Sequence, residues 1–181
     1  IRLRDWSSDV CSSDLSGALL GDWEEVENLA PTITAATRLD IEVPLQKLPT
    51  IDDLRERWKD VEEGARETRI NRAMKLRAGY VLEGGRATHR VWIWQWGDAV
   101  IVGQPGEAYS YFQMELRRRH PERVIFVLNC TNGPGYMYLP TPEAYRRLRY
   151  QAWQTLLAEG GLELITDEVS AAIARLPRIS R

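Results

Sequence analysis

The sequence contains few of the residue types that most directly indicate a biochemical class. It has two cysteines and two histidines in 181 residues. Once Cys11 is set aside for the reason given below, Cys130 remains alone, which excludes a disulfide framework. His89 and His120 each lack a second histidine three or four residues away, so neither starts a common metal-binding motif. No Ser-centred nucleophile elbow, Walker loop or dinucleotide fingerprint is present.

Two further absences limit the partners that the chain is expected to have. The formal net charge is −2, so the sequence lacks the basic excess that is typical of nucleic-acid binding. It also lacks an uninterrupted apolar run of about 18 residues, the length at which a membrane-spanning helix becomes a candidate. We therefore expect no nucleic-acid partner and no transmembrane segment in this chain.

The segment 5–15 is expected not to belong to the natural protein. It is rich in serine and aspartate, and in one reading frame it matches a common sequencing-library adapter. A polar N-terminal tail is the alternative interpretation. Processing scars are excluded from fold reasoning, so residues 1–15 are treated as a disordered artefact and residues 16–181 as protein that begins in mid-gene. Setting aside the three aspartates of the segment changes the formal charge to +1, still close to neutral.

The remaining residues alternate between strand-like and helix-like patterns, which predicts an α/β fold with a mixed sheet flanked by helices. The continuous apolar run at 124–128 indicates a strand that is buried on both faces. The expected elements are a short helix over 18–29, one long or two short strands over 32–45, a helix over 50–84 that Gly64 and Thr68 bend or break, strands over 88–96 and 99–102 joined by a turn at Gly97-Asp98, a helix over 107–119, a strand over 123–128, and helices over 141–159 and 162–176.

Two Gly/Pro-rich loops place potential oxygen ligands directly after apolar strands. Glu107 closes the first loop, which begins at Gly103, and Tyr136 and Tyr138 lie in the second, which begins at Asn132. The ends of strands are where functional loops of α/β proteins gather, so the two loops could converge on one site. Simpler interpretations exist: Glu107 as a first-turn carboxylate that complements a helix dipole, and the tyrosines as residues that pack a turn.

Trp92, Trp94 and Trp96 share one face of their predicted strand, opposite Val91 and Ile93. They could form a binding surface for a sugar or a lipid. Packing under a helix is the favoured interpretation, because large aromatic side chains dominate the burial of apolar area in protein cores. Similarly, Cys130 at the end of an apolar strand is interpreted as a small buried thiol.

Several motifs in combination resemble the C-terminal half of the catalytic domain of the neutral/alkaline, non-lysosomal ceramidases. The resemblance covers most of residues 33–176, and its motifs are moderately specific together and weak singly. They are Glu42-Val43-Pro44-Leu45, Gly97-Asp98, Pro105-Gly106-Glu107, Asn132, Tyr138-Leu139-Pro140-Thr141, Glu143-Ala144-Tyr145 and Tyr150-Gln151-Ala152.

The resemblance implies a zinc-dependent amidase that hydrolyses the N-acyl bond of ceramide-like lipids. Zinc in this family is held by two histidines, a glutamate and a tyrosine. By motif, Glu107 and Tyr138 would be metal ligands, and Asn132 and Tyr136 would contact the substrate. The two histidines and the serine-containing active-site segment belong to an N-terminal half that this chain lacks and that would be its partner. The resemblance also suggests a secreted, periplasmic or membrane-associated location.

Two departures from the family pattern leave alternatives open. The usual Asn-x-Tyr-x-x-Tyr is replaced here by a segment one residue out of step, so Tyr136 and Tyr138 could exchange roles. Ala108-Tyr109 replaces the more usual Phe/Pro-Thr. This departure argues against ceramide itself as the substrate more than against amide hydrolysis in general. Three hypotheses follow: a zinc amidase that is incomplete and inactive in this chain alone, a family member with a different substrate, and a non-catalytic binding module that uses the tryptophan strand.

Overall fold

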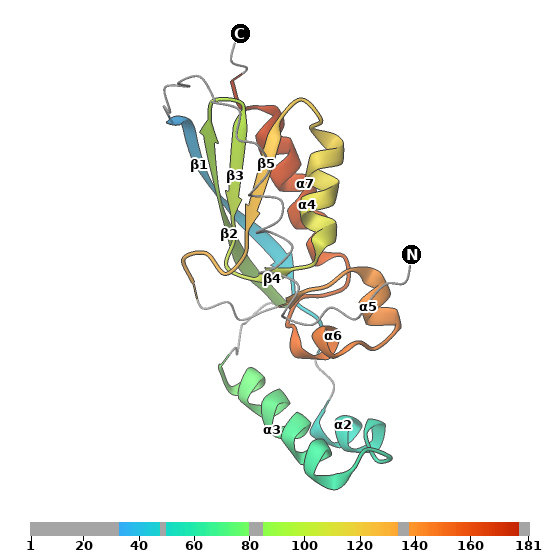
Figure 1. Cartoon of the computed structure of the whole chain (residues 1–181). Helices are drawn as coiled ribbons and strands as arrows, with labels where there is room; N and C mark the ends of the chain where they lie inside the picture. The colour runs from blue at the N-terminus through green and yellow to red at the C-terminus, as the bar shows by residue number, and fades with distance from the viewer. Residues whose placement is uncertain (1–32, 48–49, 80–84, 134–137, 178–181) are drawn as a thin grey trace, which may run out of the picture. The chain divides into compact units, whose positions relative to one another are not determined.

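The computed structural model describes residues 33–47, 50–79, 85–133 and 138–177. All of them belong to one compact unit. They form an α/β fold with a mixed sheet (Figure 1), which confirms the predicted fold class. The segment interpreted as an artefact and the helix predicted over 18–29 lie outside the described residues.

The main sheet has four strands, and only its last pair is parallel. Strands β1 and β2 are antiparallel, as are β2 and β3, whereas β3 and β5 run in parallel. The predicted two-residue hairpin is confirmed, and Gly97 adopts φ +58° in its turn, a left-handed conformation that glycine adopts readily. The strand order is β1 (Ile33–Pro44), β2 (Arg86–Trp96), β3 (Ala99–Gly103) and β5 (Val124–Leu128).

A second, very short sheet lies beyond the ends of β3 and β5. It consists of β4 (Glu107–Ala108) and β6 (Tyr138–Leu139), which are parallel to each other. Because β4 follows β3 closely along the chain and β6 follows β5, this small sheet continues the parallel relation of the larger one. It contains Glu107 and Tyr138, the two residues for which the family resemblance implies a metal-binding role.

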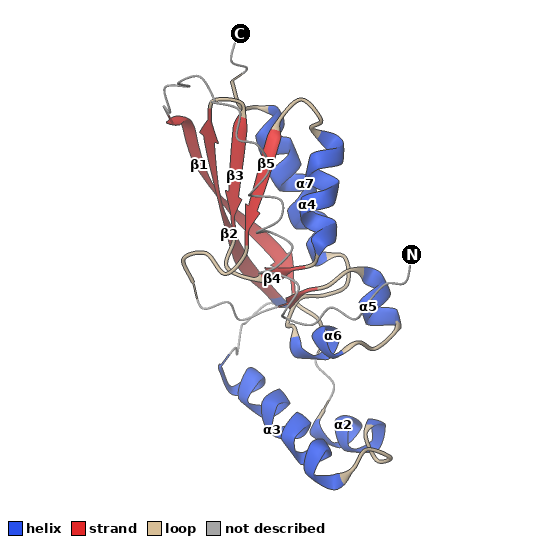
Figure 2. Ribbon diagram, in the orientation of Figure 1, coloured by secondary structure: helices blue, strands red, loops and turns tan. Residues whose placement is uncertain are grey.

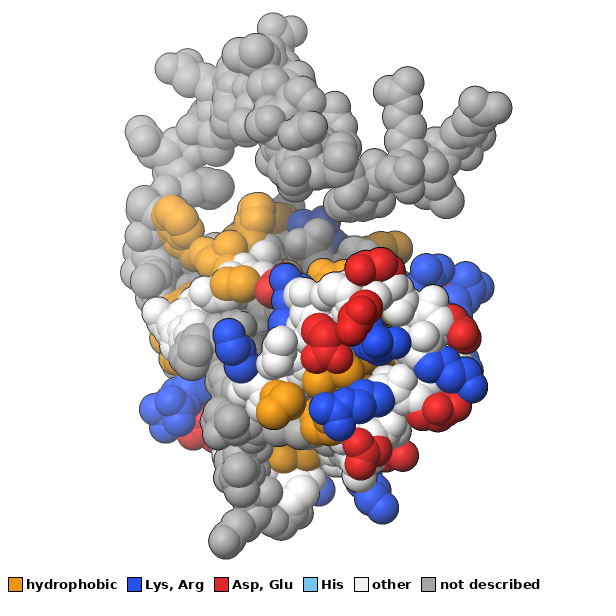
Figure 3. Space-filling model, turned by 90° about the horizontal axis from the view of Figure 1, so that it is seen from below, with side chains coloured by type: hydrophobic (Ala, Val, Ile, Leu, Met, Phe, Trp, Pro, Cys, Tyr) orange, Lys and Arg blue, Asp and Glu red, His pale blue; other side chains and the backbone are white. Residues whose placement is uncertain are grey.

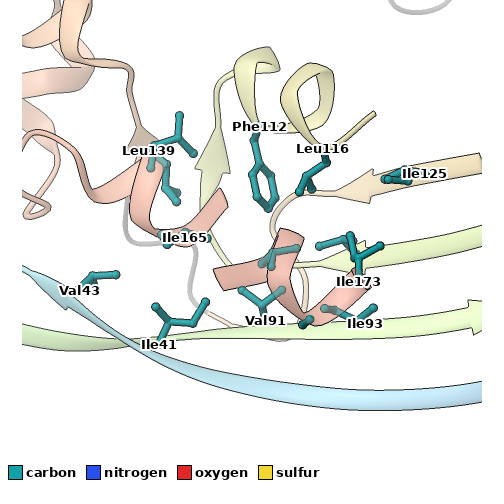
Figure 4. Packing of buried hydrophobic residues seen from close by; sticks show 14 of the residues in the cluster. Ile41, Val43, Val91, Ile93, Phe112, Leu116, Ile125, Leu139, Ile165 and Ile173 are labelled. Carbon is teal, nitrogen blue, oxygen red and sulfur yellow. The ribbon is translucent and has the colours of Figure 1, made fainter. Parts of the chain in front are cut away.

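Two long helices cover one face of the main sheet (Figure 2). Helix α4 (Ser110–Arg119) packs on β5, helix α7 (Gly161–Ala174) packs on β1 and β2, and the two helices pack on each other. Their apolar side chains meet the inward-facing residues of the strands to form the main core, as Figure 4 shows. The labelled members are Ile41, Val43, Val91, Ile93, Phe112, Leu116, Ile125, Leu139, Ile165 and Ile173.

The long helix predicted after Thr50 is two helices. The capping box at Thr50 is present: the Thr50 side chain accepts from the Asp53 N–H, and the Asp53 carboxylate accepts from the Thr50 N–H. Helix α2 (Ile51–Arg57) then stops, and α3 (Glu63–Gly79) begins only after the Glu62 carboxylate accepts from the N–H groups of Gly64 and Ala65. The interruption expected at Gly64 therefore falls just before it.

The helix predicted over 141–159 is also divided. Thr141 and Pro142 begin a helix as predicted, but α5 (Pro142–Arg146) and α6 (Tyr150–Gln154) are one turn each. Leu148 lies between them with φ +48°, a left-handed conformation that interrupts the helix. Trp153 of α6 packs edge to face on Trp58, with ring centroids 4.9 Å apart, and so joins α6 to a small second core of Leu54, Trp58, Ile70 and Ala73.

The other face of the main sheet contradicts two predictions. Trp92, Trp94 and Trp96 lie opposite the helix-covered face, so the expectation that they pack under a helix is wrong. β5 is an edge strand, and Phe126 is 49% exposed, so the prediction of a strand buried on both faces is also wrong. The pattern was misleading because both faces of these strands carry apolar residues, and periodicity cannot tell which face a helix will cover.

This uncovered surface is named here the open apolar face. The register places Trp94 beside Ile101 and Ile101 beside Phe126, and it aligns Trp92 with Gly103 and Leu128 in the next row. Leu128 and Trp96 are both about half exposed, at 48% and 47%. Further along β1 and β2, the same face becomes polar, since Arg90 bonds Asp40 at 2.8 Å. The open apolar face comprises Trp92, Trp94, Trp96, Ile101, Val124, Phe126 and Leu128.

Charged side chains of both signs are distributed over the surface. On the face shown in Figure 3, basic and acidic side chains are interspersed across the described residues. Several of them form pairs within one helix, such as Arg118 with Glu115 at 2.7 Å. Exposed pairs of this kind contribute only about 0–1 kcal/mol each, so the packed core is the main source of stability.

Phe112 provides a direct test of that core. Its side chain is 1% exposed under α4, whereas Met114 on the same helix is 66% exposed. We predict that Phe112→Ala lowers the free energy of unfolding by about 3–5 kcal/mol, because it leaves a cavity between α4 and the sheet. Met114→Ala should change it by less than about 0.5 kcal/mol. Urea unfolding of both variants measures the difference, and equal effects would contradict the packing described.

Candidate functional site

Glu107 and Tyr138 lie side by side. They are register partners in the parallel pair β4–β6. Directly paired residues of neighbouring strands, about 4.8 Å apart, project to the same face of a sheet. The Glu107 carboxylate also raises the pKa of Tyr138 by its charge. The loop that ends at Glu107 and the loop that contains Tyr138 therefore converge. This was expected because each loop follows a strand.

The local structure of Glu107 differs from its prediction. The helix that was expected to start at Glu107 starts at Ser110, with Tyr109 as the N-cap. Glu107 belongs to β4 and is exposed. The interpretation of Glu107 as a first-turn carboxylate is therefore wrong. Its side chain is exposed to solvent beside Tyr138.

Tyr138 is held by a second tyrosine that sequence reasoning did not assign to the site. The Tyr150 and Tyr138 hydroxyl groups are hydrogen-bonded to each other at 3.1 Å, and the two rings meet edge to face with centroids 5.2 Å apart. This hydrogen bond, together with partial burial and the Glu107 charge, raises the pKa of Tyr138 to about 12. The phenol is thus neutral near pH 7, and only a strong positive charge nearby would favour the phenolate.

A buried glutamine fixes the two loops to each other. The Gln104 side chain donates to the Gly106 carbonyl and accepts from the Gly106 N–H, both at 2.7 Å. It also donates to the Asn129 Oδ1 at 2.5 Å, and Asn129 in turn donates to the Ala108 carbonyl at 3.2 Å. These bonds, named here the Gln104 clamp, join the loop after β3 to the end of β5. Because Gly106 and Ala108 flank Glu107, the clamp fixes the backbone on both sides of it.

Sequence reasoning missed the Gln104 clamp although a weak signal was present. Gln104 and Asn129 are each the first amide side chain after an apolar strand. Polar residues commonly follow strands in loops, so this position alone does not distinguish a buried bridge from a solvated turn. The parallel pairing of β3 with β5, which brings the two amides together, was not predictable from either strand.

Three other predictions concern residues that follow β5, and the structure tests the one on Cys130. Cys130 is exposed and has φ +55°, so its interpretation as a buried thiol is wrong. Asn132 is also exposed, with φ +53°, a conformation that asparagine tolerates better than most residues. Tyr136 lies outside the described residues. The substrate-binding roles of Asn132 and Tyr136 therefore remain predictions.

His89 lies on the strand face of Val91 and Ile93, as predicted, and is buried at the inner side of the Gln104 clamp. Its side chain is 3% exposed, and Nε2 has no hydrogen-bond partner in the described part of the chain. Burial lowers the pKa of His89 to about 4, while a hydrogen bond with Gln104 acts in the opposite direction. His89 is thus a neutral core residue near pH 7, and it links the core to the clamp.

The described residues contain no cluster of three or more His, Cys, Asp and Glu side chains that could hold a metal ion. Glu107 and Tyr138 fit two positions of a mixed shell, since a carboxylate and a phenolate are both oxygen donors suited to a divalent cation. They would have to be completed by other ligands.

Comparison with protein-family models, curated proteins and solved structures gives no match to this chain. Among the described helices, none has both the length and the apolar character of a membrane span. What the chain does must therefore be inferred from its residues and their geometry.

The burial of His89 predicts a specific loss of stability in acid. In the unfolded chain its pKa is near 6.5, and in the folded chain it is about 4. Below pH 6.5 the unfolded state binds a proton that the folded state does not, so stability that is present at pH 7 is lost as the pH falls toward 4. The loss from this group is roughly 3 kcal/mol. The free energy of unfolding, measured by urea at pH 7 and at pH 4, should therefore differ by roughly 3 kcal/mol less in His89→Leu than in the unsubstituted chain.

His120 is the matched control for this titration. Its pKa is also lowered by burial, and Nε2 lies 2.9 Å from the Ser170 hydroxyl, far along the chain from the clamp. His120→Gln should retain the loss of unfolding free energy between pH 7 and pH 4 that His89 causes. An unchanged pH dependence in His89→Leu would show that folding does not lower the pKa of His89.

Proposed function

We propose that this chain is the C-terminal part of the catalytic domain of a zinc-dependent amidohydrolase similar to the neutral/alkaline ceramidases. The observation that carries the proposal is the register pairing of Glu107 with Tyr138 at the end of the parallel strands. The same two residues were nominated as metal ligands by motif. Their proximity is what a shared metal shell requires.

In this proposal, Glu107 and Tyr138 hold a zinc ion together with two histidines from the N-terminal half of the domain. When bound, zinc polarises an amide carbonyl and lowers the pKa of a water molecule. Tyr150 keeps the Tyr138 oxygen oriented through its hydroxyl hydrogen bond. The Gln104 clamp keeps Glu107 in register with Tyr138, a second set of contacts of the kind that orients metal ligands in proteins.

The open apolar face supports the proposal that this chain is part of a larger domain. Four of its side chains are about half exposed: Trp96, Val124, Phe126 and Leu128. Large contiguous exposed apolar surface is uncommon on monomeric soluble proteins and marks an interaction site. In the proposed enzyme, the missing half of the domain covers this face.

The same face favours a second candidate function, a non-catalytic interaction module. In that case the face would contact a different protein or an apolar ligand, and Glu107 and Tyr138 would be ordinary surface residues. Aromatic side chains such as Trp96 and Phe126 are enriched at binding surfaces of this kind. The two functions differ in whether the face is covered by the rest of the same polypeptide.

Zinc content tests the amidase proposal. We predict that the protein encoded by the complete gene retains zinc after dialysis and hydrolyses N-acyl amides. Glu107→Ala combined with Tyr138→Phe removes half of the proposed ligands, so zinc content and turnover should both fall to background. Glu168→Ala is the control, since Glu168 is an exposed carboxylate on α7, outside the β4–β6 pair. Metal analysis and an amide-hydrolysis assay measure the outcome.

Zinc content that does not change in the Glu107/Tyr138 double variant would contradict the assignment. The 181-residue chain alone contains at most two of the proposed ligands and is predicted to be inactive. Zinc-dependent turnover by the purified chain would show that prediction to be wrong.

Binding of an apolar fluorescent dye distinguishes the two candidate functions. The chain alone should bind the dye, and Trp96→Lys with Phe126→Lys should reduce the fluorescence several-fold by placing charges on the open apolar face. Met114→Lys, on exposed α4 surface away from that face, should have little effect. In the proposed enzyme, the complete protein binds little dye because the face is covered. Strong dye binding by the complete protein, abolished by the same double variant, would favour the interaction module.

A further inference from the structure

A cavity of about 420 Å³ lies beside the Glu107–Tyr138 pair. One hydrogen bond and one sequence neighbour relate its lining to that pair. Tyr109, which lines the cavity, donates its N–H to the carbonyl of Leu139, the residue after Tyr138, at 3.2 Å. Arg149, which also lines it, immediately precedes Tyr150, whose hydroxyl contacts Tyr138. The residues that line the cavity are Tyr109, Thr141, Glu143, Ala144, Arg147, Arg149 and Gln151.

The cavity carries an excess of positive charge. Arg147 and Arg149 line it, and Glu143 is the only carboxylate among the described lining residues. Glu143 is already paired with Arg147, with Oε1 and Nη2 2.7 Å apart. Arg149 makes no ion pair with any other described residue. One guanidinium is therefore available to a ligand.

The turn that presents the two arginines has an unusual backbone. Leu148, between them, has φ +48° and is 61% exposed. A left-handed conformation costs about 1 kcal/mol or more for a residue with a Cβ. The turn is held by a hydrogen bond from the Arg149 N–H to the Ala144 carbonyl at 2.9 Å, and another from the Leu148 N–H to the Tyr145 carbonyl at 3.0 Å. Both arginines thus start from fixed backbone positions on the cavity wall.

Neutral donors accompany the charge. Tyr109 contributes a phenol hydroxyl to the cavity wall. Thr141 and Gln151 add a hydroxyl and an amide to the wall. Arg149 is exposed at the cavity, and a guanidinium with neighbouring neutral donors suits the oxygens of a carboxylate or a phosphate.

We propose that this cavity binds an anionic group, a carboxylate or a phosphate, carried by the substrate close to the bond that is cleaved. This inference rests on the proposed function for the identity of the bond, and it names the substrate class as acidic N-acyl amides. Anion binding itself depends only on Arg149 and its neighbours. It can therefore be tested without zinc.

The test is a titration of the full 181-residue chain, without metal, with inorganic phosphate and separately with N-acetylglycine, followed by backbone amide NMR shifts. We expect saturable shifts at Tyr109 and over 141–151. Arg149→Gln should weaken binding about tenfold or more, as loss of a charged hydrogen-bonding partner does. Glu143→Gln should tighten it, because the one opposing carboxylate is removed. The phosphate and N-acetylglycine arms identify which anion the cavity prefers.

Arg146→Gln is the matched control. Arg146 lies three residues before Arg149, and its substitution removes the same charge, but it pairs with Glu159 at 3.5 Å and does not line the cavity. Binding should stay within about twofold of the unsubstituted chain, as expected for an exposed surface charge. Equal weakening by Arg146→Gln and Arg149→Gln, or no saturable binding of either anion, would overturn the inference. The Glu107→Ala/Tyr138→Phe double variant should bind the anion normally, because neither residue lines the cavity. The anion result therefore does not depend on whether the zinc proposal is correct.

In the complete enzyme, the same substitution has a distinct kinetic signature. Arg149→Gln should raise KM for an N-acyl amino acid severalfold while leaving KM for a neutral N-acyl amide unchanged. A neutral amide preferred over the acidic one by the unsubstituted enzyme would contradict the proposed substrate class.

Discussion

The parallel pairing of β3 with β5 is the constraint on which the candidate site depends. Parallel neighbours end at the same edge of a sheet, so the loops that follow them emerge together, and β4 and β6 pair beyond that edge. An antiparallel β5 would place its following loop at the far end of a five-residue strand, about 16 Å away. Helix α4 makes the parallel pairing possible by crossing from the end of β3 to the start of β5. Its burial against the sheet therefore serves the site as well as the core.

The buried polar groups at that edge fix the backbone, and the more exposed ones are accessible to a ligand. Gln104 is fully buried, and its amide satisfies the backbone of Gly106 and the side chain of Asn129. Such a group fixes geometry, because any rearrangement would leave it unpaired at a cost of about 1–3 kcal/mol. Glu107 and Tyr138 lie outside the clamp, where a ligand can reach them. Arg147 and Arg149 line the cavity from the turn between α5 and α6. Tyr109, which also lines it, bonds the carbonyl of Leu139 in β6, so the proposed metal shell and anion site would share the backbone of the β4–β6 pair.

Much of the fold could be predicted from the sequence, whereas less of the site could. Alternation in β2, the Gly97 turn and the cap at Thr50 are local signals, and the structure has each of them. Two of the failures concern non-local facts. Glu107 pairs with a strand that is distant in sequence and so is extended instead of helical, and the tryptophans face away from the helices that were expected to cover them. Tyr150 acts through Tyr138, and Gln104 acts through Asn129, and no spacing rule connects the members of either pair.

The central proposal is that Glu107 and Tyr138 are ligands of one zinc ion. Anomalous scattering at the zinc absorption edge, measured on crystals of the protein encoded by the complete gene, tests it directly. The proposal predicts a single strong peak about 2.0–2.2 Å from a Glu107 carboxylate oxygen and at a similar distance from the Tyr138 phenolic oxygen. A zinc peak with a full set of ligands that includes neither residue would contradict it.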